Sequence, residues 1–392
     1  MISFNNTEVA FKHKSNKDLK RAHFLFSVMG NSFLVKTGKG LTRFGLNTGL
    51  PIKGIIKSTI FKQFCGGETI QECTQTINDL WKFKVGTILD YSVEGKTDEK
   101  DFEATTNEII ATIQKAKVNP DAVPFAVFKV TGIVRFDLLE KSNLSTDKLS
   151  SEDLLTYQHA IERIERICKA AYDASVPVFI DAEETWIQDV IDRITHDMML
   201  KFNKQTAIVF NTVQMYRHDR LAFLKDSLEW AKANNIQYGV KLVRGAYMEK
   251  ERARALEKGY PSPIQPDKNT CDTDYNEALK FLLHADQFEF MSLCAGSHNE
   301  NSADILAQLM ESNSISKDNK RIYFAQLLGM SDHISYTLAS LGYNVAKYVP
   351  YGPVKEVIPY LFRRADENTS VKGQTGRELS MIKEELKRRK GN

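Results

Sequence analysis

The stretch DLLTYQHAIERIERICKAAYDASVPVFID, residues 153–181, contains one copy of the helix-then-strand pattern that decides the fold. Residues 153–174 mix polar and apolar side chains as a helix does, and the run 176–180 that follows is short and almost wholly apolar. A short apolar run after a helical segment is typical of a parallel strand that is buried on both faces. We therefore predict a helix at 153–174 and a strand at 176–180.

The same pattern recurs along most of the chain. Further β-rich runs lie at 86–91, 125–130, 206–212, 238–243, 288–294, 321–327 and 345–349, and further helical stretches lie at 219–234, 273–285 and 299–310. Regular alternation of strands and helices predicts a parallel α/β fold. Eight strands over this length favour a (β/α)8 barrel, and a doubly wound open sheet is the alternative.

Residues 1–80 are rich in helical and loop patterns and lack strand alternation. We therefore predict an N-terminal helical arm at 1–80 and a catalytic barrel at 81–392. The composition, 42% hydrophobic and 26% charged, is that of a soluble globular protein. No apolar run is long enough to span a bilayer, and the pattern of a signal peptide is absent.

Charge and cysteine content exclude several classes of protein. The net charge of +3 is too small to indicate a nucleic-acid partner. The five cysteines are scattered without a CxxC pair, which indicates neither a disulfide framework nor a zinc site and favours a reducing compartment. Residues 19–67 contain no acid and many lysines and arginines. This segment suits contact with an anionic membrane or an acidic partner, unless acids from elsewhere in the fold balance it.

The stretch YLFRRADEN, residues 360–368, places two adjacent arginines in a predicted helix. Helical spacing puts Tyr360, Arg363, Arg364 and Glu367 on one face, and Gly352-Pro353 provides a helix start signal. A pair of guanidinium groups suits the bidentate binding of a carboxylate. The segment is therefore either a carboxylate-binding helix of an enzyme for a small acid or a solvated charged face.

Polar side chains also gather where the predicted strands end, and in a (β/α)8 barrel the chemistry lies at the carboxyl ends of the strands. They are Glu94, Lys129, Asp181 with Glu183 and Glu184, Gln214, Arg244 with Tyr247, His298, Gln326 and Tyr348. The three acids at 181–184 suit a metal, a general base or a substrate amine, or else they form an ordinary first helical turn. Lys241 lies inside a strand, where a lysine requires an anion or the electron-rich edge of a cofactor.

Several common nucleotide and hydrolase motifs are missing. The sequence has no GxGxxG after a strand, no GxxxxGK[ST], no HExxH and no GxSxG.

Six motifs in order resemble the proline dehydrogenase family. They are DAEE (181–184), KLVRGAY (241–247), SHN (297–299), FAQLLGM (324–330), KYVPYG (347–352) and YLFRRADEN (360–368), and the resemblance covers roughly residues 60–385. The motif forms are similar to those of the eukaryotic branch and of monofunctional bacterial relatives. Because the chain ends soon after the last motif, we expect no attached aldehyde dehydrogenase domain.

The resemblance implies a distorted TIM-like barrel that holds FAD without a covalent bond and no metal. It implies oxidation of L-proline to 1-pyrroline-5-carboxylate, the first step of proline catabolism, by hydride transfer from C5 to flavin N5, with a membrane quinone as electron acceptor. The residues that the motifs match to flavin-binding positions are Gln214, Lys241, Arg244, Ala246, Tyr247 and His298. Lysine at position 241 departs from the bifunctional bacterial branch, which has arginine there.

The resemblance also assigns the substrate side of the site. Arg363 and Arg364 would bind the proline carboxylate with help from Lys129, and Asp181 would lie beside the substrate. Tyr348 and Tyr360 would wall the ring, with Leu327 and Tyr247 packed around it, and Glu94 would pair with Arg363 as a gate.

Three other functions stay open at this stage. Hydroxyproline oxidation is the nearest, although a tyrosine at 348 leaves little space for a 4-hydroxyl group. A flavin-free barrel that binds a small acid and a metal-assisted lyase built on Asp181, Glu183 and His298 are the others. The N-terminus is poor in arginine and has Glu8 early, unlike a mitochondrial presequence. We therefore expect the bacterial cytoplasm, at the inner face of the membrane, rather than the mitochondrial matrix.

Overall fold

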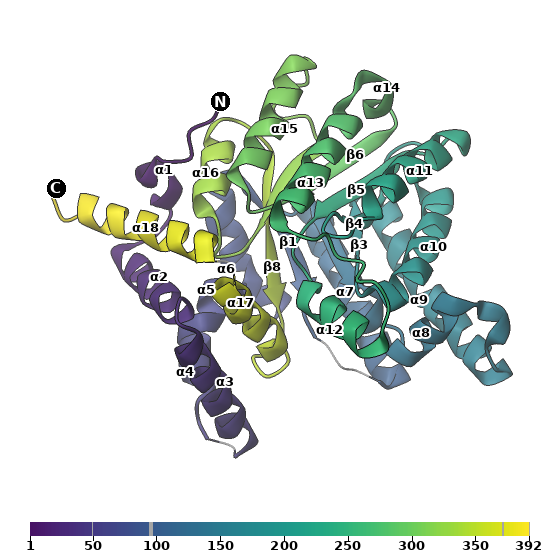
Figure 1. The fold of residues 1–392 in the computed structure, drawn as a ribbon, viewed down its shortest axis with the longest axis horizontal. Helices are drawn as coiled ribbons and strands as arrows, with labels where there is room; N and C mark the ends of the chain where they lie inside the picture. The colour runs from purple at the N-terminus through teal and green to yellow at the C-terminus, as the bar shows by residue number, and fades with distance from the viewer. Residues whose placement is uncertain (49, 94–96, 371, 392) are drawn as a thin grey trace. The chain divides into compact units, whose positions relative to one another are not determined.

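Eight parallel strands form a closed barrel in chain order, as the (β/α)8 prediction requires (Figure 1). The computed structural model describes residues 1–48, 50–93, 97–370 and 372–391. The strands are β1 (Val85–Tyr91), β2 (Phe125–Lys129), β3 (Val178–Asp181), β4 (Val209–Gln214), β5 (Tyr238–Val243), β6 (Met291–Gly296), β7 (Ile322–Leu327) and β8 (Val345–Tyr351). The predicted fold class is confirmed.

Helices occupy most of the chain between and around these strands. Before β1 lie α1 (Thr7–Phe11), α2 (Asn16–Met29), α3 (Ser32–Asn47), α4 (Lys53–Ile56), the π-helix η1 (Lys57–Phe61), α5 (Lys62–Phe64) and α6 (Ile70–Trp81). Between β1 and β6 lie α7 (Glu99–Val118), α8 (Phe136–Leu144), α9 (Ser151–Ala174), α10 (Thr185–Phe202), α11 (Arg220–Ala233), α12 (Met248–Lys258), α13 (Lys268–Leu283) and α14 (Ala285–Phe288). The remaining α-helices are α15 (Glu300–Ser312), α16 (Asp332–Ser340), α17 (Ile358–Ser370) and α18 (Lys372–Arg388), and two short 3-10 helices are η2 (Val130–Gly132) and η3 (Thr146–Lys148).

The α9–β3 repeat shows how local sequence sets these elements. The Ser150 side chain accepts a hydrogen bond from the Asp153 amide and caps the first turn of α9. Ser175 ends the helix in a left-handed conformation (φ 53°), and Pro177 then prevents the helix from continuing. All four residues of β3 are buried, as expected for a strand with covered faces.

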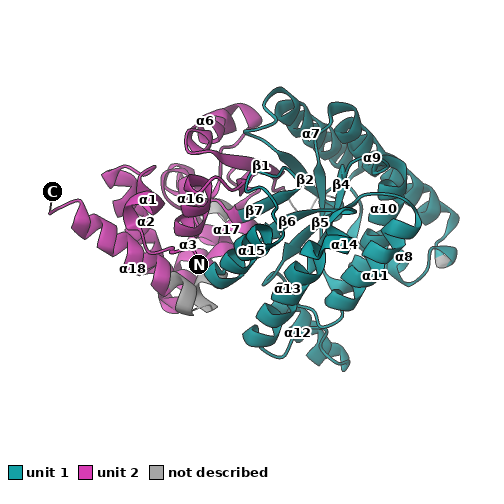
Figure 2. Ribbon diagram, turned by 90° about the horizontal axis from the view of Figure 1, so that it is seen from above, with its two compact units in different colours: residues 1, 95–325 teal, residues 2–94, 326–392 magenta. Residues whose placement is uncertain are grey.

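The chain forms two compact units, which Figure 2 shows in different colours. One unit comprises residues 1 and 95–325 and contains β2 to β6. The other comprises residues 2–94 and 326–392 and contains β1 and β8, which pair in parallel from Val85↔Val345 to Tyr91↔Tyr351. The predicted division into an arm at 1–80 and a barrel at 81–392 stays a prediction.

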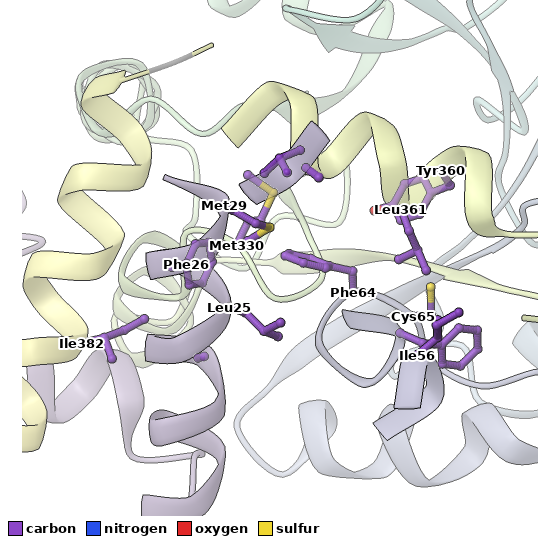
Figure 3. Packing of buried hydrophobic residues seen from close by; sticks show 14 of the residues in the cluster. Leu25, Phe26, Met29, Ile56, Phe64, Cys65, Met330, Tyr360, Leu361 and Ile382 are labelled. Atoms are coloured by element: carbon purple, nitrogen blue, oxygen red, sulfur yellow. The ribbon is translucent and has the colours of Figure 1, made fainter. Parts of the chain in front are cut away.

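A hydrophobic core within the second unit joins the first helices of the chain to the last ones (Figure 3). Phe26 of α2 meets Phe64 of α5 edge to face, with ring centroids 6.3 Å apart. Tyr360 and Leu361 of α17 and Ile382 of α18 belong to the same cluster. Apolar residues of the predicted arm therefore share one core with elements that follow β7.

Several predicted boundaries differ from those in the structure, and three of the differences have identifiable reasons. The fourth strand begins at Val209 rather than at 206, because the Asn203 side chain accepts hydrogen bonds from the amides of Ile208 (3.0 Å) and Val209 (2.8 Å) and turns the chain there. The sixth strand begins at Met291 rather than at 288, because residues up to Phe288 form α14.

The helix with the two arginines begins at Ile358, not at Pro353. The Pro353 carbonyl accepts hydrogen bonds from the amides of Glu356 (2.8 Å) and Val357 (3.2 Å), so a separate turn precedes the helix. The proline therefore starts the turn, and the predicted helix start was wrong.

Candidate active site

The buried carboxylate of Asp181 lies between two lysines that come from other strands of the first unit. Lys129 and Asp181 are the last residues of β2 and β3 and are register partners. Lys129 Nζ lies 3.9 Å from one Asp181 oxygen, and Lys241 of β5 forms an ion pair with the other. Lys241 is 5% exposed, so Asp181 supplies the negative charge that a buried ammonium needs. Lys129 and Asp181 were predicted at strand ends and lie there, whereas the ion pair between Asp181 and Lys241 was not predicted.

Gln214, the last residue of β4, has a buried side-chain oxygen that accepts no hydrogen bond from the described residues. Its side-chain amide nitrogen donates to the Glu183 carbonyl (2.6 Å) and to the Tyr216 hydroxyl (2.7 Å). Its side-chain oxygen is buried and has no hydrogen-bond partner among the described residues. A buried acceptor normally has a donor, so a ligand with an N–H group would satisfy it.

Arg244 follows β5 and is held from three sides. Its guanidinium group stacks on the Tyr275 ring at 3.8 Å, forms an ion pair with Asp272 and donates to the Ser302 hydroxyl (2.6 Å). Its Nε is buried without a partner in the described part of the chain. The arginine is thus fixed in position with one donor left over for a ligand.

The backbone after Arg244 takes an unusual path before α12. Gly245 (φ 87°) and Tyr247 (φ 52°) both adopt left-handed conformations, which for tyrosine carries strain. A Cβ atom built on Gly245 would meet no atom within 4 Å, so the glycine is needed for its backbone angle rather than for close packing. Ala246 and Tyr247 are half-buried at this bend. The predicted approach of a flat ring to this bend stays a prediction.

His298 follows β6 in a short capped turn. The Ser297 hydroxyl accepts from the Asn299 amide (3.1 Å), and the Asn299 side chain caps α15 by accepting from the Asn301 and Ser302 amides (2.9 and 3.2 Å). The His298 side chain is half-buried between these two turn residues. Its neighbours therefore fix the backbone from which it projects.

The other two acids after β3 have structural partners. Glu183 accepts from the backbone amide (3.0 Å) and the hydroxyl of Thr131, and burial raises its pKa to about 7. Glu184 precedes α10 and pairs with Lys250. Both acids are thus engaged by protein groups, and among the described residues no cluster of three or more His, Cys, Asp or Glu could hold a metal. The geometry gives the metal-assisted lyase no support.

The predicted substrate residues of the second unit lie on α17. The guanidinium of Arg364 lies 5.1 Å from the centre of the Tyr360 ring, which confirms that these two residues share a helical face. Arg364 is 9% exposed and Arg363 is half-buried. The predicted gate residue Glu94 and the side chain of Glu367 lie outside what the structure describes.

Two further predicted residues of this unit lie on the last two strands. Leu327 closes β7 and packs against the core cluster to which Tyr360 belongs. Tyr348 of β8 is half-buried, and its carbonyl accepts from the Leu328 amide (2.9 Å). The backbone therefore places the end of β7 next to Tyr348.

Sequence reasoning missed the residues that hold these groups. Thr131 holds Glu183, Asp272 and Tyr275 hold Arg244, and Lys347 lies fully buried inside β8. For Thr131, Asp272 and Tyr275 the sequence contains no signal, because their partners are distant along the chain. Lys347 did carry a signal, since a lysine within a buried strand requires an anionic partner.

A sequence model of one protein family matches most of the chain. The model is that of proline dehydrogenase, and it matches residues 73–377. The chain belongs to the proline dehydrogenase family. It is therefore an oxidoreductase that acts on proline, and the family resemblance found in six short motifs is confirmed.

Relatives that match over most of this chain include another proline dehydrogenase. The chain is 33% identical over 427 residues to "Proline dehydrogenase 1, mitochondrial" of Dictyostelium discoideum, covering 98% of this chain and 74% of the relative. It is 33% identical over 340 residues to "Carbapenem antibiotics biosynthesis protein CarD" of Pectobacterium carotovorum, covering 86% of each. It is 30% identical over 423 residues to a hydroxyproline dehydrogenase of Xenopus laevis, covering 99% of this chain and 90% of the relative.

Solved structures support the fold. Proline utilization A from Bdellovibrio bacteriovorus, inactivated by N-propargylglycine, matches with a TM-score of 0.73 and 20% sequence identity. The match covers 94% of this chain and 38% of that one, so this chain spans well under half of the solved protein. At this identity the likeness concerns the fold alone.

Proposed function

We propose that this proline dehydrogenase uses non-covalently bound FAD to oxidise L-proline to 1-pyrroline-5-carboxylate, and that it passes the electrons to a quinone. The observation that carries the proposal is the buried side-chain oxygen of Gln214, which has no hydrogen-bond partner among the described residues. Gln214 ends β4, and the strands on either side of β4 carry the ion pair between Asp181 and Lys241. Within the first unit, neighbouring strands thus offer an acceptor and a cation. The N–H group and the electron-rich carbonyl oxygens of a flavin's pyrimidine edge suit these two groups, and when bound the flavin supplies hydride acceptance.

The residues present fit the cofactor in other respects. Arg244 keeps one buried donor, and the left-handed bend at Gly245 and Tyr247 leaves backbone accessible beside it. We assign Gln214, Lys241, Arg244, Ala246, Tyr247 and His298 to flavin binding. A lysine at position 241 keeps a positive charge near the ring but lacks the planar fork of arginine.

On the substrate side, we assign Arg363 and Arg364 to the proline carboxylate, since adjacent guanidinium groups favour a shared anion. We assign contact with the proline ring to Tyr348, Tyr360, Leu327 and Tyr247. Lys129 is assigned to binding the proline carboxylate, and Glu94 is assigned to a gate that it forms with Arg363. Proline must lose its ammonium proton before a hydride leaves C5, because the nitrogen lone pair stabilises the positive charge that develops. Asp181, held by its two lysines, is assigned to ordering the substrate.

Hydroxyproline is the second candidate substrate, because a hydroxyproline dehydrogenase is 30% identical over 99% of this chain. The half-buried Tyr348 argues for proline, since a bulky ring leaves little space for a 4-hydroxyl group.

An anaerobic visible spectrum of the purified protein tests both the cofactor and the substrate. We expect flavin bands that L-proline bleaches, with trans-4-hydroxy-L-proline much less effective in a parallel cuvette. Bleaching by hydroxyproline alone would transfer the function to the second candidate. If flavin bands were absent even after FAD is added, the proposal would fail and a flavin-free binding barrel would replace it.

We further propose that α3 contacts the membrane in which the quinone lies. Phe33, Leu41 and Phe44 of α3 are 72%, 65% and 62% exposed, and Phe33 and Phe44 lie three helical turns apart on one side. Large apolar residues exposed together on an amphipathic helix suit the interface of a bilayer. No helix among the described residues is long and apolar enough to cross a membrane.

The basic character of residues 19–67 is partly neutralised within the fold. Lys39 pairs with Asp366 (2.7 Å), Lys53 with Glu68 (3.0 Å), and Lys57 with Glu68 (2.7 Å). Acids from outside the segment therefore balance part of its charge, which is the alternative that the sequence left open. The apolar side of α3, more than the net charge, carries the membrane proposal.

Co-sedimentation with anionic vesicles at low salt tests this contact. The Phe33→Ser/Phe44→Ser variant should lose most of the sedimenting fraction. The matched control is Leu154→Ser/Leu155→Ser, which removes two exposed leucines (41% and 54%) from α9 of the other unit and should sediment as the wild type does. Equal loss in both variants, or no sedimentation of the wild type, would contradict the assignment to α3.

A further inference from the structure

The loop after β7, residues 328–331, is held by side chains from separate segments of the second unit. Lys347 of β8 donates to the Met330 carbonyl (2.5 Å) and lies 3.4 Å from the Leu327 carbonyl. The side-chain amide of Gln63 donates a hydrogen bond to the Gly329 carbonyl (2.9 Å). The Ser331 amide donates to the buried carboxylate of Glu378 in α18 (2.9 Å). Consecutive residues of one short loop are thus fixed by three different elements.

Close packing leaves this loop little freedom to take another path. Gly329 adopts a left-handed conformation (φ 75°), and a Cβ atom built there would lie 2.1 Å from the Gln63 carbonyl oxygen. Only glycine fits this position, because the backbones approach too closely for any side chain. The loop conformation is therefore set by its surroundings rather than by its own sequence alone.

A buried charge cluster continues from this loop to the first helix of the chain. Lys347 is fully buried and pairs with Asp332 (2.9 Å), the first residue of α16. The other Asp332 oxygen lies 3.0 Å from Lys14 and 3.4 Å from His13, just after α1. The His13 ring stacks on Tyr336 at 3.7 Å, and burial lowers its pKa to about 4, so it is neutral at physiological pH.

Electrostatics explain why this cluster is sensitive to its outermost member. Asp332 is fully buried between two ammonium groups, and each removes part of the cost of burying the carboxylate. Lys14 is the partner nearest the surface, with 15% of its side chain exposed. Loss of the Lys14 charge would weaken the balance of charge around Asp332 and would let Lys347 shift. Lys347 also contacts the Met330 carbonyl of the loop and the Leu327 carbonyl at the end of β7.

We infer that Lys347, Asp332 and Lys14 are positioning residues for proline binding, and that they act by fixing the loop that joins Leu327 to α16. The inference rests on the proposed function, which places Leu327 and Tyr348 beside the proline ring. The Leu328 amide bonds the Tyr348 carbonyl (2.9 Å), so a shift of the loop would move both ring contacts. Substrate affinity thereby depends on a lysine that follows α1, more than 300 positions before Leu327 in the sequence.

The first test compares Lys14→Met with Lys17→Met. Lys17 is an exposed lysine three positions further on, so its substitution removes the same charge at the surface. We expect Lys14→Met to raise the KM for proline about 3–10-fold with kcat within twofold, corresponding to about 0.7–1.4 kcal/mol. Hydrogen exchange of the Leu328, Met330 and Ser331 amides should become at least fivefold faster. Lys17→Met should change neither quantity, and an unchanged KM in Lys14→Met with active wild type would overturn the inference.

The second test separates positioning from stability. Lys347→Met alone should be strongly destabilised, whereas Asp332→Asn/Lys347→Met removes both buried charges and should recover much of the thermal midpoint. The positioning role predicts that KM stays raised in the double variant, because the contacts from Lys347 to the loop are still missing. Recovery of KM together with the midpoint would show that the cluster is only structural and would overturn the inference. If the wild type does not oxidise proline, the proposed function fails separately, and the exchange data still decide whether Lys14 fixes the loop.

Discussion

The two units hold their candidate site residues in different ways. In the first unit, Asp181, Gln214 and Lys241 lie on neighbouring strands, are buried, and are held by partners one or two strands away. In the second unit, Arg363 and Arg364 lie on a helix. That helix is held by apolar packing against residues more than 300 positions earlier and by a surface ion pair, Lys39–Asp366.

This difference teaches what each group of residues depends on. The strand residues are fixed by the hydrogen-bonded barrel, and their charges balance each other inside it, so removal of one charge exposes the full cost of burying its partner. The helix residues keep their place by hydrophobic contact, which tolerates the loss of a surface charge. Variants in the two regions should therefore differ in size and in kind.

The largest effect is expected for Lys241→Met. It removes the closer of the two lysines that pair with Asp181 and leaves Lys129 at 3.9 Å, and breaking a buried pair in this way costs about 3–5 kcal/mol. We expect a lower thermal midpoint and loss of most of the bound flavin, measured by absorbance after gel filtration. Lys241→Arg keeps the charge and is the control, and it should retain flavin. Full flavin content in the Lys241→Met variant would contradict the view that the site residues of the first unit depend on balanced buried charges.

The next effect concerns Glu183, whose pKa is raised to about 7 by burial. Between the ordinary carboxyl pKa and pH 7 the folded state keeps a proton that the unfolded state has lost, so stability falls as pH rises through this window. The Glu183→Gln variant can keep the Thr131 contacts without titrating. Relative to this variant, the wild type should lose about 3 kcal/mol between pH 4.5 and pH 8.

Thermal or urea unfolding of both proteins across this pH range measures the difference, and contributions from other groups cancel in the comparison. A constant difference between the two proteins at all pH values would show that Glu183 titrates normally despite its burial.

The third prediction concerns Arg364 on α17. Arg364→Met should raise the KM for proline about 10–100-fold, since a charge-assisted hydrogen bond contributes about 1.5–3 kcal/mol. Because Arg364 is also packed on Tyr360, Arg364→Lys is the informative partner variant: it keeps the charge but loses the fork, and it should recover only part of the affinity. Steady-state kinetics with proline decide the question. A KM unchanged in both variants would remove Arg364 from the carboxylate site.

The same contrast explains what the sequence could predict. All eight strands were found because a parallel strand buried on both faces is a continuous apolar run, and the predicted range 238–243 matches β5 at both ends. For Lys241, which lies inside β5, the sequence required an anion or a cofactor edge but did not identify Asp181 as its partner. The strand starts at Val209 and Met291 were missed, because a buried asparagine and a short helix decide them.

Prediction was weaker for the second unit, where contacts between distant segments dominate. The turn at Pro353 is held by local amides that could equally begin a helix. The docking of α17 depends on the core cluster, in which Phe26 and Met330 are more than 300 residues apart. No local pattern reports such a contact, so the Arg-Arg motif predicted the helix and its face but not what holds it.

The smallest effect is expected for the Lys39–Asp366 ion pair, and it tests this view of α17 directly. The side chains are 22% and 56% exposed, so the pair should contribute only about 0.2–1 kcal/mol. A double-mutant cycle with Lys39→Met and Asp366→Asn should give a coupling energy in this range, measured by urea unfolding, and a change in KM below threefold. Lys39 also lies 5.4 Å from the Phe362 ring, so Lys39→Arg should behave as the wild type does. A coupling energy above about 2 kcal/mol would mean that charge, not apolar packing, holds the arginine helix, and the two units would then keep their site residues in place by the same means.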